Sequence, residues 1–187
     1  MTAAVLLAAG AGRRMGRPKA LVEIDGEPLV LRAVRVLHEA GVDDVSVVVG
    51  ARGDEVATLV GSLADVVTNP GWDGGMAGSL RAGLGSLDGT HDATLIHLVD
   101  LPWVTPEAVR RVVHLASPTV LARAAYDGVP GHPVLIGREH WDAVLAGLSG
   151  DQGARSWLAG RPDLHLVECG DVARGDDTDR PQDLSQA

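Results

Sequence analysis

Short apolar runs alternate with helical patterns along the first hundred residues. The runs predict four strands, at residues 5–7, 45–49, 65–68 and 93–99. Apolar positions spaced three and four apart predict helices at residues 29–37, 54–60 and 76–84. Because strands alternate with helices, we expect a parallel sheet with helices on both faces.

The pattern changes after Thr105-Pro106-Glu107, which has the residues of a helix start: an N-cap side chain, a first-turn proline and an early carboxylate. Two apolar stretches, 119–124 and 132–136, flank a turn-forming segment and predict a hairpin. Further helices are expected at 138–147 and 152–159, and a last strand near 164–168. The prediction is an α/β, Rossmann-like three-layer αβα sandwich, with a mostly parallel sheet and a small β-hairpin excursion.

The length of 187 residues fits one domain, spanning 1–187. With 45% apolar and 22% charged residues and no biased tract, the chain reads as globular. It has no apolar run long enough to cross a bilayer and no basic region typical of a signal peptide, so we expect a cytoplasmic protein. The single cysteine, Cys169, is expected to be a small buried hydrophobe.

The formal charge of −9 argues against binding to nucleic acid or to an anionic membrane. Against this background, Arg13, Arg14, Arg17 and Lys19 fall within seven positions, and Lys19 is the only lysine beside 15 arginines. A compact ammonium on a flexible stem can approach a phosphate where a planar guanidinium does not fit.

The segment after the first predicted strand is a candidate phosphate loop. It reads Leu7-Ala8-Ala9-Gly10-Ala11-Gly12-Arg13-Arg14-Met15-Gly16-Arg17-Pro18-Lys19. Small residues let backbone N–H groups approach an anion, and the nearby cations neutralise its charge. The glycine spacing differs from the dinucleotide fingerprint, and no Gly-Lys pair forms a Walker loop. A tight turn with a solvated basic face is the alternative.

Asp100 ends the apolar strand at 93–99 and is followed by Leu101-Pro102. A carboxylate there lies at the sheet edge where α/β proteins bind ligands, and its hard oxygens suit Mg²⁺. The alternative is a turn aspartate.

These residues resemble the signature of the molybdenum cofactor cytidylyltransferases and guanylyltransferases, a nucleotidyltransferase family. The match covers Leu7, Ala8, Ala9, Gly10, Gly12, Arg14, Met15, Gly16 and Lys19. The resemblance implies the fold of the nucleotide-diphospho-sugar transferases, with the loop around a triphosphate. It implies catalytic roles for Arg14, Lys19 and Asp100, with Arg13 as a helper and Asp100 as a metal ligand.

The acidic segment 171–183 is either a tail or a return to the active centre. The family ends in two aspartates separated by one apolar residue and followed by Thr-Pro-Glu-Asp-Leu. Aligned on Pro181, the second aspartate is Asp179, which the resemblance assigns to the metal. This chain departs from the pattern, with Thr178 at the apolar position, Arg180 at the threonine and Gln182 at the glutamate.

The loop 69–80 resembles the cytidylyltransferase branch and is interpreted as recognising base and ribose. The resemblance assigns nucleotide contacts to Asn69, Gly75, Met76 and Ser79, whereas Trp72 is expected to pack. Segments 128–137 and 150–155 resemble the same branch, which implies that His132 and Arg155 line the acceptor side. The alternatives are a turn histidine and a surface ion pair.

The expected reaction is Mg²⁺-dependent transfer of a nucleoside monophosphate from an NTP to a phosphorylated small molecule, with release of pyrophosphate. Alanine at position 9 favours CTP over the bulkier GTP. Molybdopterin-type cofactor is the first candidate acceptor, and phosphoenolpyruvate, phospholactate or a sugar phosphate remain open. Two other classes are kept: a non-catalytic chaperone that delivers cofactor to a molybdoenzyme, and a dinucleotide-dependent oxidoreductase, which the glycine spacing disfavours. A transient contact with a cofactor-receiving enzyme is also expected.

Overall fold

A seven-stranded sheet forms the middle layer of the molecule, with strand order β5-β4-β1-β6-β8-β7-β9. The computed structural model describes residues 1–180 and residue 183. The strands are β1 (Thr2–Ala8), β4 (Asp44–Val49), β5 (Asp65–Thr68), β6 (Ala93–Leu98), β7 (Leu121–Tyr126), β8 (Val129–Gly137) and β9 (His165–Glu168). β1 pairs in parallel with β4 and β6, β4 with β5, and β7 with β9, whereas β8 runs antiparallel to β6 and β7. The predicted α/β class with a mostly parallel sheet is confirmed.

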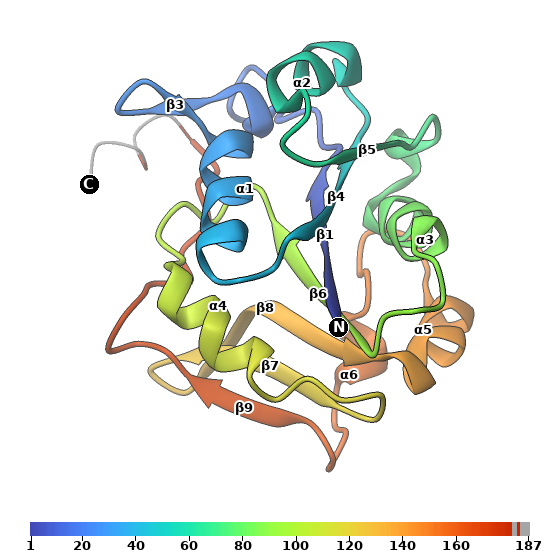
Figure 1. Cartoon of the computed structure of the whole chain (residues 1–187). Coiled ribbons are helices and arrows are strands. Elements are labelled where there is room, and N and C mark those ends of the chain that lie inside the picture. The colour runs from blue at the N-terminus through green and yellow to red at the C-terminus, as the bar shows by residue number, and fades with distance from the viewer. Residues whose placement is uncertain (181–182, 184–187) are drawn as a thin grey trace.

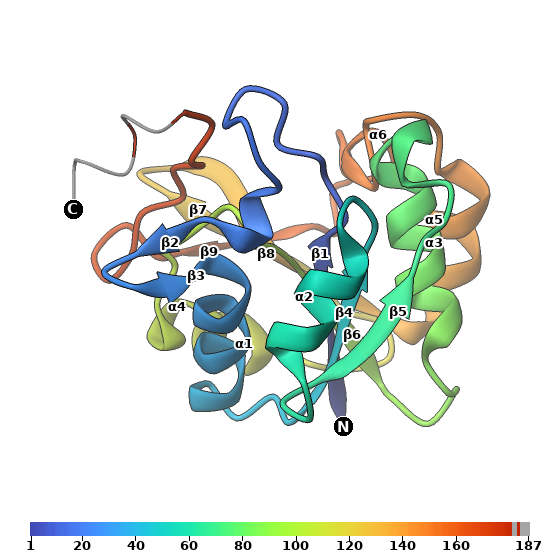
Figure 2. The same cartoon turned by 90° about the horizontal axis from the view of Figure 1, so that it is seen from above.

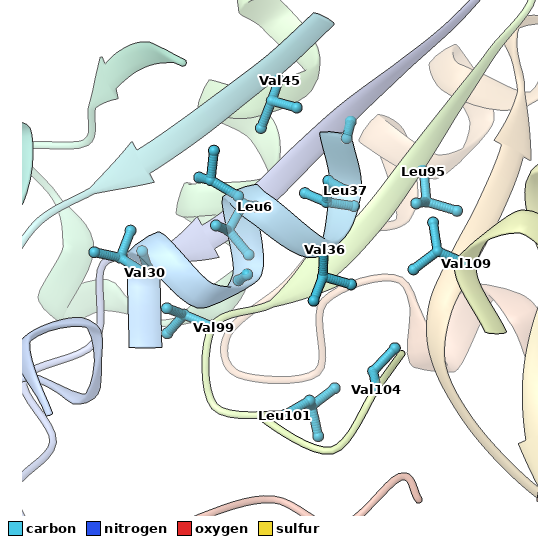
Figure 3. Packing of buried hydrophobic residues seen from close by; sticks show 14 of the residues in the cluster. Leu6, Val30, Val36, Leu37, Val45, Leu95, Val99, Leu101, Val104 and Val109 are labelled. Atoms are coloured by element: carbon cyan, nitrogen blue, oxygen red, sulfur yellow. The ribbon is translucent and has the colours of Figure 1, made fainter. Parts of the chain in front are cut away.

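Helices cover both faces of this sheet (Figure 1). One face carries α1 (Leu29–Glu39), α2 (Gly53–Val60) and α4 (Pro106–Val113). The other carries α3 (Met76–Ser86), α5 (Trp141–Gly147) and α6 (Arg155–Leu158). Figure 3 shows the core under α1, where Leu37 of the helix faces Leu6 and Leu95 of the sheet. All three of these leucines are fully buried.

The helix α1 begins at Leu29, as predicted. Pro28 occupies the N-cap position, and Glu27–Pro28 form β3, which pairs with β2 (Glu23–Ile24) in a separate two-stranded sheet. Asp25 and Gly26 join these strands with φ values of 54° and 80°, as a tight hairpin turn requires. This small sheet was not predicted because two residues per strand give no periodic pattern.

The predicted hairpin is part of the main sheet. β7 and β8 turn at Asp127-Gly128, with φ values of 51° and 77°, so the turn is shorter than the segment between the two predicted strands. Thr105 caps α4 as predicted, because its Oγ1 accepts a hydrogen bond from the Ala108 amide at 3.3 Å. The helices predicted at 138–147 and 152–159 are shorter, and Arg138–His140 form a 3₁₀ turn, η3.

The carboxyl ends of the parallel strands β1, β4, β5 and β6 meet at one edge of the sheet. The C-terminal segment returns to this edge, where the Thr178 amide donates to the Asp100 carbonyl at 3.0 Å. Figure 2 shows this red segment close to the blue loop that follows β1. Of the two interpretations of the acidic segment, the structure supports the return.

Two smaller expectations concern burial and membrane helices. Cys169 is fully buried, as predicted for a small hydrophobe. None of the helices in the described part of the chain combines the length and apolar character needed to cross a membrane.

Candidate active site

A cleft of about 520 Å³ opens at the carboxyl edge of the sheet. Its walls come from the loop after β1, the segment from Trp72 to Ser79, the end of β6, Asp151 and the C-terminal segment. Residues predicted from the sequence supply most of the lining: Leu7, Ala9, Gly10, Gly12, Arg13, Arg14, Lys19, Gly75, Met76, Ser79, Asp100 and Asp179. Arg14 and Asp179, which are 165 residues apart in the sequence, therefore line one cavity.

The loop after β1 depends on a glycine at its bend. Gly12 has φ +60°, and its carbonyl accepts a hydrogen bond from the Met15 amide at 2.9 Å. A Cβ atom at Gly12 would lie 1.9 Å from the Arg17 carbonyl oxygen, so the backbone leaves no room for a side chain. The buried Met15 side chain anchors the loop, which leaves Arg13 and Arg14 exposed at the cleft.

Lys19, at the end of the loop after β1, lies between the carboxylates of Asp100 and Asp179. Its Nζ is 2.6 Å from Asp100 Oδ2 and 2.6 Å from Asp179 Oδ1. Burial alone would lower the pKa of the Lys19 ammonium, but the hydrogen bonds to Asp100 and Asp179 outweigh it and raise that pKa above its ordinary value. The same ammonium, with help from Arg14, holds the pKa of Asp179 below its usual range. The Lys19 ammonium and the Asp179 carboxylate are therefore both charged at neutral pH.

Arg14 also forms an ion pair with Asp179. The backbone amides of Asp179 and Arg180 donate to Asp183 Oδ2 at 2.9 and 2.7 Å, which fixes the turn that presents Asp179. Pro181, Gln182 and Leu184, on which the family alignment also depends, lie outside the described residues.

Thr178 departs from the apolar residue of the family, yet it is fully buried. Its hydroxyl finds a partner in the Asp100 carbonyl at 3.3 Å, so the polar substitution leaves the two carboxylate segments joined.

A third carboxylate, Asp177, was not predicted. Asp100, Asp177 and Asp179 each offer an oxygen within 4.8 Å of the others. The donor set is all oxygen and anionic, and a lysine ammonium already lies against two of its members, so the residues fit a hard divalent cation. The three aspartates among residues 176–179 gave no pattern by which Asp177 could be chosen, since only the fold shows which of them face Asp100.

Hydrogen bonds within the segment 69–80 fix the residues that are predicted to contact the nucleotide. Asn69 Nδ2 donates to Ser79 Oγ at 3.1 Å, and the Gly71 amide donates to Asn69 Oδ1 at 3.1 Å. Asn69 is buried and positions Ser79 without lining the cleft itself. Ala8 is likewise buried beneath the loop and does not line the cleft.

Gly75 packs closely against Gly150 and Asp151, on the other side of the cleft. It has φ +106°, and a Cβ there would lie 2.5 Å from Asp151 Oδ1 and 2.7 Å from the Gly150 carbonyl oxygen. Trp72 packs against Gly50, as expected, and also lines the cleft. Asp151 and Asp73 at this wall were not predicted as site residues.

The two predicted acceptor residues do not line the described cleft. His132 is half-buried, and burial, together with the neighbouring His97 and Arg123, lowers its pKa to about 3, so its ring is neutral at neutral pH. The carbonyl of His132 accepts a hydrogen bond from the Tyr126 hydroxyl at 2.6 Å. Arg155 is exposed at the start of α6. Their acceptor roles stay predictions.

A mostly parallel sheet, a glycine-bent loop and a lysine-carboxylate cluster at the carboxyl edge are features of proteins that bind nucleotides through their phosphates. The family model described as "MobA-like NTP transferase domain" matches residues 4–167, and the chain belongs to that family of nucleotidyltransferases.

Two relatives show how varied this family is in name. The chain is 35% identical to the nicotine blue oxidoreductase of Paenarthrobacter nicotinovorans, over 96% of this chain and 93% of that one. It is 34% identical to the molybdenum cofactor guanylyltransferase of Rhodobacter capsulatus, over 76% of this chain and 67% of that one.

Solved structures agree with the fold. A nucleotidyl transferase from Methanothermobacter thermautotroptrophicus superposes with a TM-score of 0.84 and 26% identity, over 100% of this chain and 95% of that chain. Rv0371c of Mycobacterium tuberculosis, solved in complex with manganese, gives a TM-score of 0.80 and 26% identity, over 99% of this chain and 96% of that one.

Proposed function

We propose that this chain transfers the nucleoside monophosphate of CTP to a phosphorylated small molecule of the molybdopterin type, in the cytoplasm and with Mg²⁺. The observation that carries the proposal is the meeting of Lys19, Asp100 and Asp179 in one cleft with the glycine-bent loop. A purely structural salt bridge would not need a loop of exposed amides and arginines beside it.

The chain's own groups suit charge compensation during the transfer. An oxygen of the acceptor phosphate bonds to the α-phosphorus, while the bond to the β-phosphate oxygen breaks and its electron pair leaves with pyrophosphate. The loop amides after Gly10, with Arg14 and Lys19, would hold the triphosphate and neutralise the charge on the departing group. The acceptor phosphate is already anionic, so the reaction needs no protein nucleophile.

Asp100, Asp177 and Asp179 would hold the Mg²⁺, which supplies positive charge to the phosphates when bound. The manganese complex of Rv0371c supports a divalent cation in this fold.

CTP is preferred because Ala9 places a methyl group on the cleft wall. GTP is the second candidate nucleotide, since the Rhodobacter relative is named a guanylyltransferase. Release of pyrophosphate from each of the four NTPs, measured with a panel of phosphorylated acceptors, tests the choice. Turnover with GTP and none with CTP would refute the CTP assignment.

The variants Lys19→Met and Asp100→Asn test the site itself. Each should lower turnover by at least about 100-fold, the size of loss typical when one charge-stabilising group is removed. Asp163→Asn is the matched control, because Asp163 pairs with Arg161 on the surface, outside the cleft. Pyrophosphate release that survives in both cleft variants would place the chemistry elsewhere.

An oxidoreductase is the second candidate function, favoured by the relative that matches over nearly the whole length. Oxidation of NADH or NADPH in the presence of nicotine blue measures it directly. An oxidoreductase has no need of the Lys19–Asp100 pair, so Asp100→Asn would leave that reaction largely intact. Dye reduction in the wild type without any pyrophosphate release would replace the transferase proposal.

A further inference from the structure

A second cavity, of about 450 Å³, lies between α1, the loop after Asp100 and residues 170–174. We call it the arginine groove, and its walls include Arg32, Arg35, Val36, Trp103, Val104 and Arg174. It shares no residue with the nucleotide cleft. In Figure 3 the Val36 side chain of α1 lies on the side of the helix that faces the loop carrying Leu101 and Val104.

The groove is a positive site on an acidic protein. Three arginines line it, and none of the described residues in its lining is a carboxylate, although the whole chain carries a formal charge of −9. Arg32 and Arg35 both pair with Glu27, at 3.6 and 2.9 Å, and Arg35 also pairs with Glu39 at 3.1 Å, so these carboxylates offset the charge of both arginines. Arg174 pairs with no carboxylate in the part of the chain that the structure describes, so its guanidinium is free to meet an anion.

Trp103 gives the site an aromatic wall. The Arg174 guanidinium carbon lies 4.9 Å from the centre of the Trp103 ring, and the indole is only half-buried. An arginine stacked on an aromatic face keeps its edge donors available to a carboxylate or phosphate. A planar ring attached to that anion could pack against the indole.

A buried histidine nitrogen lies next to the arginine groove. His97 is 1% exposed, and its Nδ1 has no hydrogen-bond partner among the described residues. It lines a small cavity of about 10 Å³ that shares Arg32, Val36, Pro102 and Val104 with the groove. A buried nitrogen without a partner costs free energy, so a polar group entering here would gain a hydrogen bond.

Two residues of the groove walls lie close in sequence to the carboxylates of the nucleotide cleft. Trp103 lies three residues after Asp100, and Arg174 three residues before Asp177. The Arg174 amide donates to the Trp103 carbonyl at 3.3 Å, which joins the two walls. A ligand that moves either wall would therefore change the spacing between Asp100 and Asp177.

We propose that the arginine groove is a regulatory site for a small aromatic anion, a planar ring bearing a carboxylate or phosphate, whose binding alters the placement of the cleft carboxylates. The anion pairs with Arg174, the ring packs on Trp103, and a polar substituent reaches toward His97. The regulatory effect rests on the proposed transferase function, whereas the binding site does not.

Binding is tested on the full chain by calorimetry and tryptophan fluorescence with phenyl phosphate and benzoate as probes. One molecule of phenyl phosphate should bind per chain, and Arg174→Gln should weaken it about tenfold, as expected for loss of one charge-assisted hydrogen bond. Trp103→Phe should remove most of the fluorescence change. Arg110→Gln is the control, because Arg110 pairs with Glu107 on α4, outside the groove.

Lys19→Met separates this site from the nucleotide cleft. Phenyl phosphate should bind this variant as it binds the wild type, even if the chain proves not to be a transferase. Binding that disappears in Lys19→Met and survives in Arg174→Gln would overturn the proposal, as would no binding of either probe at millimolar concentration. In an active enzyme, phenyl phosphate should change the rate of pyrophosphate release in the wild type and not in Arg174→Gln.

Discussion

Gly12 and Gly16 offer a matched test of the phosphate loop. Both have positive φ, +60° and +79°, so alanine at either position adopts a left-handed conformation. They differ in their surroundings: a Cβ at Gly16 meets nothing within 4 Å, whereas a Cβ at Gly12 would lie 1.9 Å from the Arg17 carbonyl oxygen. The two substitutions therefore share a backbone cost, and only one of them adds a steric clash.

The shared cost is about 1–2 kcal/mol, the penalty of a left-handed L-residue. In a chain of this length each kcal/mol lowers Tm by about 2–4 °C. Gly12→Ala must in addition separate the Cβ and the Arg17 oxygen to at least 3.0 Å, so the loop has to move. A displacement of about 1 Å in a group that positions substrate can lower the rate about 100-fold.

Thermal unfolding and pyrophosphate release on the same preparations check both parts. Gly16→Ala should unfold a few degrees lower and keep near wild-type turnover, while Gly12→Ala should remain folded and lose about 100-fold of its activity. If Gly12→Ala binds and turns over nucleotide as well as Gly16→Ala does, the bend at Gly12 does not shape the phosphate site.

Three further substitutions test the scaffold. Thr105→Ala should lower the free energy of unfolding by about 1 kcal/mol in a urea titration, because α4 loses its N-cap hydrogen bond. Gly83→Ala should lower it by about 1–3 kcal/mol, because the new Cβ would lie 2.4 Å from Val5 Cγ1 in a packed core. Burial lowers the pKa of His97 to about 4, so the unfolded chain binds more protons between that value and the ordinary 6.5. Stability should therefore fall as pH drops through this window, by up to about 3 kcal/mol from His97 alone, and His97→Leu should reduce that loss.

Each of these has a control. Thr105→Ser keeps the hydroxyl and should stay near the wild type. Gly85→Ala, also in α3 but with open space around it, should stabilise by about 0.5–1 kcal/mol. An unchanged pH dependence in His97→Leu would mean that another group, such as the neighbouring His132, dominates the titration.

The strands and helices followed from local patterns wherever the pattern was long enough. The apolar runs at β1, β4 and β6 are buried from end to end or nearly so, and their order along the chain indicated a parallel sheet. The position of β8 between β6 and β7 could not be read from the sequence, because strand order depends on pairings between distant segments. The same limit explains why the hairpin was predicted as an excursion, although both of its strands belong to the main sheet.

The sequence predicted those site residues that belong to continuous sequence motifs. The loop residues and Asp100 stand in recognisable runs, and Asp179 followed from the resemblance. Asp177 and Asp151 were missed because their roles arise only when the C-terminal segment and the loop at 150–155 fold back to the cleft. The arginine groove is of the same kind, since Arg32 and Arg174 lie far apart in sequence and meet only in the folded chain.

The sharing of one lysine ammonium by two carboxylates has a consequence for the order of substrate binding. Before any ligand arrives, Lys19 cancels much of the repulsion between Asp100 and Asp179 and keeps both aimed inward. If Asp100, Asp177 and Asp179 hold a divalent ion, the Lys19 ammonium would have to share two of these carboxylates with that ion. Lys19 would then have more of its charge available to the phosphates of the nucleotide, so we expect the divalent ion and the triphosphate to bind more tightly together than either does alone.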